Sequence, residues 1–464
     1  MPSVEGKGAP SASRTALLCG LMIAASIAIF LAVDRLGAGL VAPRASGPPM
    51  PRPAGGHGPD MLASVLLALV VVIVTARAVG TFFAWMRQPP VIGEVIAGIL
   101  LGPSLLGRLA PEVSCYVFRP EMLPSLGVLA QIGVILFMFL VGLELDTDLI
   151  RQRSPTAATI SVASMTTAFA GGVALALWLY PRLSTSDVPF ALFALFLGVA
   201  MSVTAFPVLV RILTDRGIDR TEVGALAISC AGVDDVAAWC LLAFVSGIAQ
   251  TRFGAAWSTV GLTLGYVAFV LAVVRPAVRA LIRRHERLGV PTQASLGLMV
   301  LCMLASALAT EWIGIHALFG AFLLGVVVPH DSRLAVELAR KLQGLVVALF
   351  LPAFFALTGL RTDLDLVGAG GHWALCLAIT LVACLGKFGG TAAAARISGL
   401  GWRDSVALGA LLNTRGLMEL IVLNVGLDQG VISPTLFSMM VVMAVVTTLL
   451  AAPVLDGLAR PVRR

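Results

Sequence analysis

Two adjacent carboxylates interrupt a long apolar stretch. Asp234 and Asp235 lie about thirteen residues into the apolar segment 222–249, which at 1.5 Å per helical residue places them roughly 20 Å along a helix, near the middle of a bilayer. Two neighbouring anions repel each other, so at least one must hold a proton or meet a cation. A buried hydrogen bond between helices explains one such aspartate more easily than two, so the pair indicates a functional site.

A single lysine is placed equally deep. Lys387 lies midway along the apolar segment 372–395 and is the only lysine within the thirteen apolar segments defined below. Snorkelling to the membrane surface is the alternative, but this position is too far from either end for that. We expect a pair with Asp234 or Asp235, which would stabilise both charges. A lysine in a low-dielectric site can release its proton when its partner is withdrawn.

A proline predicts an opened helix nearby. Pro207 ends the motif SVTAFP at 202–207 within the apolar segment 188–213. Proline removes an amide donor and clashes with the preceding turn, so the backbone should open at about 203–206. The freed carbonyls and the Thr204 hydroxyl would then be oxygen ligands for a desolvated alkali cation. A plain proline kink, common in membrane helices, is the alternative for this segment taken alone.

The segment seven places later has a polar centre of its own. Segment 403–427 carries Asn413, Arg415 and Glu419, and the last two have the i,i+4 spacing that allows a pair along one helix face. Two discontinuities at corresponding positions favour a transporter with broken helices at its substrate site. Glu94, in another apolar segment, is interpreted equally well as a structural hydrogen-bonding group or as a group on the ion pathway.

The composition requires a membrane environment for these groups. Hydrophobic residues make up 58% of the 464 residues and charged residues only 12%, about half the usual share of a soluble chain. A disordered protein, a nucleic-acid-binding protein and a disulfide-stapled secreted module are excluded. No ten-residue alternation of a membrane barrel is visible. An early apolar segment, 16–33, precedes thirteen more: 61–85, 91–106, 123–145, 156–180, 188–213, 222–249, 256–283, 294–310, 313–329, 344–360, 372–395, 403–427 and 434–456.

The distribution of Lys and Arg sets the orientation. Nineteen lie in the loops after odd-numbered segments and in the tail, and eight on the opposite side, so the first side and the C-terminus should be cytoplasmic. The early segment is either a retained helix or a signal. We divide the chain into an N-terminal apolar segment and linker (1–60), a transmembrane domain (61–456) and a short basic tail (457–464), which leaves no room for a soluble nucleotide-binding regulatory domain.

A repeated motif indicates two inverted halves. Gly142-Leu143 is followed by Asp146-x-Asp148, and Gly359-Leu360 by Asp363-x-Asp365, while a fainter echo links 98–102 with 321–325. Both pairs are seven segments apart, and an odd offset means that the second copy enters the membrane from the other side. The predicted fold is therefore all-α and polytopic. Thirteen transmembrane helices form two inverted six-helix repeats and a linker helix, with crossed discontinuous helices and one extra N-terminal segment.

Six motifs together resemble the monovalent cation/proton antiporters of the Kef and plant cation-exchanger branch, which are sodium/hydrogen exchanger-like. These are GEVIAGILLGPS at 93–104, FLVGLE at 139–144, SVTAFP at 202–207, VDDVAAW at 233–239, GKFG at 386–389 and NTRGLMELIVL at 413–423.

The resemblance implies the inverted-repeat antiporter fold and a homodimer with interleaved core and dimerisation subdomains. It also implies that Asp235 is the principal proton- and alkali-cation-binding carboxylate and that Asp234 is paired with Lys387. Kef-type systems usually carry a nucleotide-binding domain and often a Gln in place of the first Asp, and this chain has neither. Gating by nucleotide or glutathione is therefore not expected. The Asp pair instead resembles that of the electrogenic sodium/proton members.

We therefore predict a secondary active antiporter of the cell membrane, not an enzyme and without a cofactor, in which protons and Na⁺ or K⁺ compete for Asp235. A membrane aspartyl protease would need its two carboxylates on separate helices, and a channel would need repeated filter segments. The alternative is a proton-coupled exporter of an organic metabolite on the same fold. A wide apolar cavity beside Asp235 would favour the exporter, whereas a narrow oxygen-lined one would favour alkali cations.

Overall fold

The computed structural model describes residues 12–43, 59–144, 155–219, 221–250, 256–287, 293–329, 331–369 and 371–458. These residues form helices joined by short connections, and none of them lies in a strand. The predicted all-α class is confirmed. The Pro/Gly-rich stretch 44–58, most of the basic tail, and the aspartates Asp146 and Asp148 of the repeated motif lie outside the described residues.

The helices agree in number with the apolar segments. Within the described residues, twelve helical stretches are long and apolar enough to cross a membrane, α21 and α22 form one further span bent by 41°, and α15 is a shorter apolar helix. The main helices are α1 (Ala12–Gly37), α2 (Pro59–Trp85), α3 (Pro90–Leu101), α6 (Leu123–Glu144), α8 (Pro155–Leu183), α9 (Phe190–Ser202), α10 (Phe206–Asp215), α11 (Glu222–Gln250), α12 (Ala256–Phe269), α13 (Arg275–Arg287), α14 (Gln293–Ile313), α15 (Ala317–Val327), α16 (Arg333–Leu345), α17 (Leu351–Leu360), α19 (Trp373–Cys384), α20 (Gly390–Ile397), α21 (Trp402–Leu412), α22 (Leu417–Asp428) and α23 (Pro434–Leu458).

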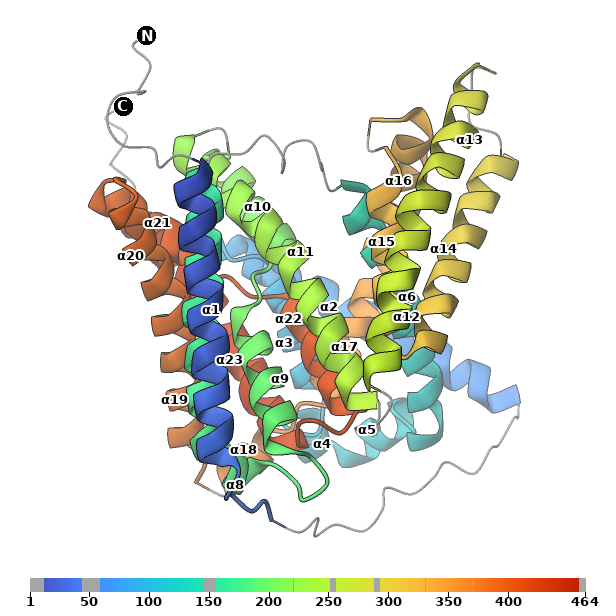
Figure 1. Ribbon diagram of the computed structural model, residues 1–464. Helices are drawn as coiled ribbons and strands as arrows, with labels where there is room; N and C mark the ends of the chain where they lie inside the picture. The colour runs from blue at the N-terminus through green and yellow to red at the C-terminus, as the bar shows by residue number, and fades with distance from the viewer. Residues whose placement is uncertain are drawn as a thin grey trace, which may run out of the picture.

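Short elements connect them. The helices α4 (Leu106–Leu109), α5 (Pro111–Val117) and α18 (Leu364–Ala369) lie at the lower end of the molecule in Figure 1, and the 3-10 turn Pro120–Met122 joins α5 to α6. Three π-helical stretches continue longer helices without a break: Val270–Val274 joins α12 to α13, Val346–Phe350 joins α16 to α17, and Leu385–Gly389 joins α19 to α20. The last of these contains Lys387.

Two boundaries differ from the sequence prediction. The ninth segment, expected over 313–329, forms the eleven-residue helix α15, because the chain turns at Gly314, whose φ is 91°, a conformation that suits glycine. The tenth segment, expected from residue 344, begins earlier with α16, whose amphipathic first part carries Glu337, Arg340 and Lys341. Charged side chains on one face hid this part from an apolar-segment search.

The N-terminal helix α1 lies along α8 and also contacts α9 (Figure 1). Val33 of α1 belongs to the main buried cluster, and Gly37 lies against the ring of Phe190 at the start of α9. The part of this helix from Leu17 to Gly37 is long and apolar enough to span a membrane. The sequence prediction of an added apolar segment is confirmed.

The inverted repeat is visible as one contact made twice. Gly98 of α3 packs against the backbone of α17 at Gly359, and Gly142 of α6 packs against the backbone of α15 at Gly325. Helices α3 and α15 are the second and ninth segments, and α6 and α17 are the third and tenth. Each contact therefore joins one helix of the second/ninth pair to one helix of the third/tenth pair. Glycine at these positions lets the helices approach at backbone distance, which explains why the motif retains them.

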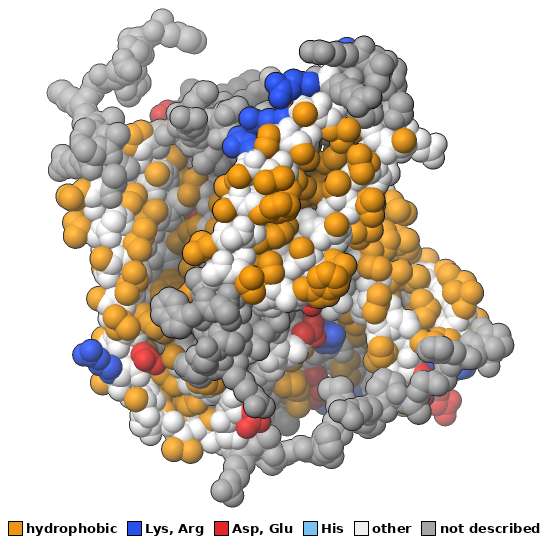
Figure 2. Space-filling view, turned by 45° about the vertical axis from the view of Figure 1, so that its right-hand side comes forward, with side chains coloured by type: hydrophobic (Ala, Val, Ile, Leu, Met, Phe, Trp, Pro, Cys, Tyr) orange, Lys and Arg blue, Asp and Glu red, His pale blue; other side chains and the backbone are white. Residues whose placement is uncertain are grey.

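The surface is that of a membrane protein. Figure 2 shows a broad belt of hydrophobic side chains, with Lys and Arg gathered above it at the end of the molecule where α13 lies in Figure 1. Large apolar residues are exposed all along the outer helices, among them Leu62, Leu301 and Ile397. Exposure of this kind is stable in lipid and not in water. The chain is thus a multi-pass membrane protein.

Candidate functional site

The first helix break separates α9 from α10. Helix α9 ends at Ser202 and α10 begins at Phe206, with non-helical residues 203–205 between them. Pro207 lies in the first turn of α10, where its missing amide would have had no helical partner and its fixed φ favours the helix. The backbone therefore opens where the sequence predicted, and Pro207 initiates the second half-helix.

The second break separates α21 from α22 and crosses the first. Helix α21 ends at Leu412 and α22 begins at Leu417. The Ala205 amide donates to the Thr414 carbonyl at 3.1 Å, and the Thr204 hydroxyl lies 3.3 Å from the Leu412 carbonyl. Two opened segments that are far apart in sequence thus share hydrogen bonds, and four helix ends point towards one place.

Two cationic side chains occupy the carboxyl end of α9. Lys387 Nζ donates to the Ser202 carbonyl at 2.6 Å, while Arg415 donates to the carbonyls of Ala200 at 3.0 Å and Met201 at 2.7 Å. A helix that ends inside the protein leaves carbonyls without amide partners and carries partial negative charge there. Lys387 and Arg415 supply hydrogen-bond donors for these carbonyls and positive charge opposite the partial negative charge.

Asp234 is held by three donors. Its Oδ2 accepts from Lys387 Nζ at 2.8 Å and from the Thr204 hydroxyl at 2.7 Å, and its Oδ1 accepts from the Ser161 hydroxyl of α8. The carboxyl, lysine, threonine and serine side chains are all fully buried. Of the two pairings left open by the sequence, the structure contains the one between Lys387 and Asp234.

Asp235 is in a contrasting environment one residue later. It is 1% exposed, and among the described residues neither carboxyl oxygen has a hydrogen-bond partner. The Phe206 amide at the start of α10 approaches this carboxyl as a backbone donor, but outside normal hydrogen-bond geometry. A buried anion without a well-formed hydrogen bond is unfavourable by several kcal/mol. This group therefore needs a bound proton or a bound cation.

Arg415 and Glu419 form a second buried ion pair. Arg415 Nη1 lies 2.7 Å from Glu419 Oε2, and both side chains are fully buried. Arg415 lies in the break and Glu419 in the first turn of α22, so the pair joins the opened segment to the half-helix and does not run along one continuous helix. Thr448 of α23 bonds both the amide and the carbonyl of Arg415, at 2.8 Å and 2.7 Å. Asn413, also in the break, contacts Cys384 Sγ at 3.6 Å.

Glu94 is the candidate that the structure leaves apart from this cluster. It lies in α3 opposite Gly80 of α2, and Arg77 of α2 is the charged group that acts on it. The hydrogen bonds around Asp234 do not extend to it. Of the two interpretations left open for Glu94, this position gives no support to direct participation in the site.

Comparison with known proteins agrees with this geometry. The family described as "Sodium/hydrogen exchanger, transmembrane" matches residues 65–460. The chain belongs to this family.

Individual relatives cover most of the chain. It is 43% identical to the Na⁺/H⁺ antiporter NhaS4 of Synechocystis, over 85% of this chain and 97% of that protein. It is 38% identical to cation/H⁺ antiporter 19 of Arabidopsis thaliana and 33% identical to K⁺/H⁺ antiporter 1 of Saccharomyces cerevisiae, covering 87% and 84% of this chain. The matched part is 50% and 46% of those two longer proteins.

A solved structure has the same fold. The sodium proton antiporter MjNhaP1 from Methanocaldococcus jannaschii superposes with a TM-score of 0.58, over 85% of this chain and 97% of that one, at 13% identity. At this identity the match shows the fold alone, and it confirms the antiporter fold expected from the sequence.

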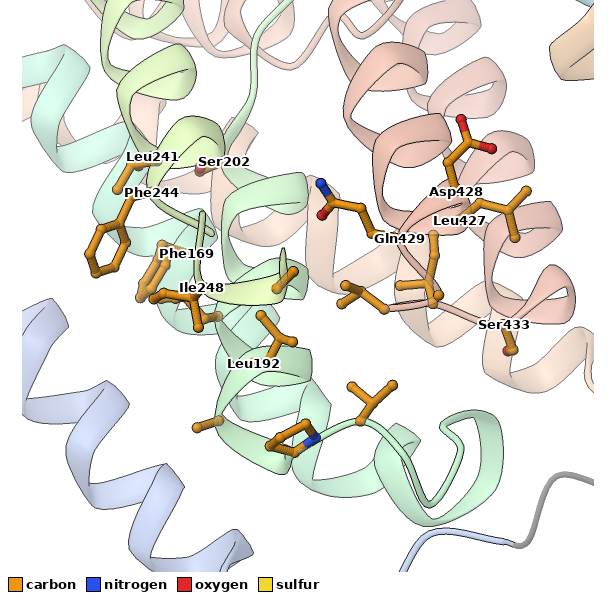
Figure 3. Close-up of a pocket in the computed structure, with 18 of the residues that line it drawn as sticks. Phe169, Leu192, Ser202, Leu241, Phe244, Ile248, Leu427, Asp428, Gln429 and Ser433 are labelled. Carbon is orange, nitrogen blue, oxygen red and sulfur yellow. The ribbon is translucent and has the colours of Figure 1, made fainter. Parts of the chain in front are cut away.

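A large cavity leads to the site of this exchanger-family chain. It has a volume of about 2270 Å³ and is lined mainly by apolar side chains of α1, α6, α8, α9 and α11. Figure 3 shows Leu241, Phe244 and Ile248 along one wall with Ser202 beside them, and Asp428 and Gln429 on the opposite side. Neither aspartate of the pair lines this cavity. The cavity is wide and apolar and reaches Ser202 and Ala237, whereas the Asp234 carboxyl is bonded by the hydroxyls of Ser161 and Thr204 and by Lys387.

One residue of the site escaped the sequence analysis. Ser161 contacts Asp234 from α8, a helix without any singled-out polar group. A signal was nevertheless present, because Ser161, Ser164 and Thr167 recur at every third residue of an apolar segment. Such spacing places the three on one face of a helix.

Proposed function

We propose that the chain is a secondary active antiporter that exchanges a monovalent cation, Na⁺ or K⁺, for protons by alternating access. The observation that carries this proposal is the contrast within the aspartate pair. Asp234 has three donors, whereas the buried Asp235 has no hydrogen bond of normal geometry within the described structure. The names of the relatives, Na⁺/H⁺ and K⁺/H⁺ antiporters, support the same substrates.

Competition at Asp235 couples the two substrates. A proton neutralises the carboxylate, and an alkali cation does so by direct coordination, so the two exclude each other. A desolvated cation also needs neutral oxygens. The Thr204 hydroxyl and the Leu412 carbonyl lie together at the crossing of the breaks and would complete its shell. The partial negative charge at the end of α21 favours a cation there.

The Asp234–Lys387 pair adds a second proton to the cycle. A cation bound beside Asp234 competes with the ammonium group for its charge. Lys387 is fully buried, and an ammonium group that loses its counter-ion in such a place gives up its proton. Exchange of two protons for one cation is electrogenic, so it responds to membrane potential.

Alternating access requires one part of the molecule to move against another. We place the broken helices and α8, α11 and α23 in a core subdomain, and α2, α3, α6, α14, α15 and α17 in a dimerisation subdomain that pairs with a second copy. The family resemblance supports the homodimer. The basic side formed by α13 and the loops supports a cytoplasmic C-terminus in the cell membrane.

The test is proton flux in proteoliposomes. The purified chain should acidify or alkalinise the lumen on addition of Na⁺ or K⁺, with Li⁺ as a further probe, and an imposed potential should change the rate. Asp235→Asn should abolish this flux without loss of fold. Asp215→Asn removes the same charge from an exposed position on α10 and should leave it intact. Cation-dependent proton transport by Asp235→Asn would refute the proposal.

The cavity is the observation that favours a second candidate, a proton-coupled exporter of an organic metabolite. Its volume and apolar walls would accommodate an organic molecule. The hydroxyls of Ser161 and Thr204 at Asp234, and the Leu412 carbonyl near Thr204, favour the alkali cation. The same vesicles separate the two, because an exporter would show no Asp235-dependent proton flux with any alkali cation.

A further inference from the structure

Helix α13 carries three arginines at intervals of four residues, Arg275, Arg279 and Arg283, which we call the α13 arginine row. This spacing places them along one side of the helix, one turn apart. Arg279 and Arg283 are exposed, and Arg275 is partly exposed. Val278 and Ile282 of the same helix are buried. Helix α13 therefore packs against the protein through an adjacent apolar face and leaves the arginine row outside.

The α13 arginine row lies where this part of the chain leaves the hydrocarbon. Helix α12, the π-helical stretch after it and α13 form one continuous rod, in which Gly261–Arg283 is long and apolar enough to cross a membrane. A bilayer core about 30 Å thick takes about 20 helical residues. Counted from Ala256, where α12 begins, the core ends near Arg275. Arg279 and Arg283 follow about 6 Å and about 12 Å further on, at the depth of lipid headgroups.

The three arginines have no carboxylate partner among the described side chains. Exposed basic residues of α16, at the same end of the molecule (Figure 1), do have one, since Arg340 pairs with Glu337 at 2.8 Å. In the row, Arg283 Nε donates to the Arg279 carbonyl at 3.3 Å, which uses one of the five N–H groups of its guanidinium. Like charges one helical turn apart repel each other. The row is therefore stabilised by an anion that the described part of the chain does not supply.

The surroundings of the row favour an anion that carries hydrocarbon. The guanidinium group binds phosphate oxygens in a bidentate manner, and phosphate is the anionic group at this depth of a bilayer. Leu264 and Leu271 precede the row on the same rod and are exposed, so acyl chains would contact them. Figure 2 shows this sequence of surfaces, with Lys and Arg directly above the hydrophobic belt. A soluble anion would satisfy the charges alone, whereas an anionic phospholipid fits both surfaces.

We propose that the α13 arginine row is a binding site for anionic phospholipids of the adjacent leaflet. The arginines bond the phosphate oxygens, and the apolar residues before them contact the acyl chains. The rod that carries the row is the seventh apolar segment, 256–283, which is the linker between the two predicted six-helix repeats. A bound lipid therefore holds this linker at a fixed depth in the membrane. The inference concerns lipid binding and does not depend on which ions the chain exchanges.

The experiment measures lipid binding by the purified full chain in detergent micelles. The probe is fluorescently labelled phosphatidylglycerol, and labelled phosphatidylcholine with the same acyl chains is the neutral comparison. An arginine near an anionic lipid surface contributes about a fivefold factor in affinity. The wild type should therefore prefer phosphatidylglycerol by at least about tenfold. Unlabelled phosphatidylglycerol should also raise the melting temperature, because it binds the folded chain.

The test variant replaces the whole row, as Arg275→Gln, Arg279→Gln and Arg283→Gln in one chain. Its preference for phosphatidylglycerol should fall to within about threefold, because the neutral amides lack the charge that attracts phosphate. The matched control removes the same total charge from three other exposed arginines that do not form a row, as Arg108→Gln, Arg119→Gln and Arg182→Gln. This control should keep the preference of the wild type.

Four outcomes would overturn the proposal. They are equal affinity of the wild type for the two lipids, a test variant that keeps the preference, a control that loses as much, and displacement of the labelled lipid by glycerol phosphate at similar concentrations. The last would indicate a site for a soluble phosphate. Loss of positive charge can also disturb insertion. If the test variant does not insert, Arg279→Gln decides: a loss of about fivefold in affinity supports the site, and unchanged affinity refutes it.

Discussion

Removal of the lysine from the buried ion pair tests the electrostatics of the site. Lys387→Met retains the length and apolar stem of the side chain but leaves Asp234 with only the hydroxyls of Ser161 and Thr204. Loss of one partner from a buried pair costs about 3–5 kcal/mol, and the lost hydrogen bond to Ser202 adds about 1 kcal/mol. At roughly 2 °C per kcal/mol, a value for large domains, the melting temperature should fall by about 8–12 °C.

The assay is thermal unfolding in detergent at several pH values. The loss should shrink as the pH falls, because protonation of Asp234 removes the uncompensated charge. The double variant Asp234→Asn/Lys387→Met carries no buried charge at this position, so it should be more stable than Lys387→Met alone. Wild-type stability of Lys387→Met at neutral pH, or a double variant no better than the single one, would refute this account of the pair.

Two further predictions concern neighbouring groups. Thr204→Val removes the hydroxyl near Leu412 while preserving the shape of the side chain. The KM for the cation, measured from initial flux, should rise about tenfold with little change in maximal rate. An unchanged KM would exclude Thr204 from the cation shell. Glu419→Gln leaves the buried Arg415 charge unpaired and should lower the melting temperature by roughly 6–10 °C. Arg361→Gln breaks a half-exposed ion pair with Asp428, which is worth at most about 1 kcal/mol. Equal falls in melting temperature for Glu419→Gln and Arg361→Gln would therefore contradict the role assigned to burial.

Much of the fold could be predicted because a bilayer constrains features that can be counted along the sequence, such as the length of each apolar segment. Apolar length fixed the spans, and the proline at 207 marked the first break. The glycine motifs at 142 and 359 revealed the repeat that the structure displays as paired backbone contacts. The aspartates and Lys387 were conspicuous for a similar reason, since ionised groups are rare in hydrocarbon.

What the sequence left open depends on three-dimensional neighbours. Whether Lys387 pairs with the first or the second aspartate is decided by the π-helical stretch and by the direction of α11, neither of which has a sequence signature. Arg415 was expected to pair along one helix, but the break lets its guanidinium also reach the end of α9. The two interpretations of Glu94 stayed open because the sequence gives its depth along the chain but not the direction of its side chain, which in the structure lies opposite Gly80 of α2.

The two glycine contacts, Gly98 with Gly359 and Gly142 with Gly325, have a mechanical consequence. Where two helix backbones touch, no side chains lie between them that could change rotamer and let the helices slide past each other by small steps. The four helices α3, α6, α15 and α17 therefore form one stiff block, clamped at two related points. In the alternating access proposed above, we therefore expect deformation outside this block, along the cavity walls that Leu241 and Phe244 line. Apolar side chains form few directional bonds, so we expect this surface to be where one rigid body turns against the other.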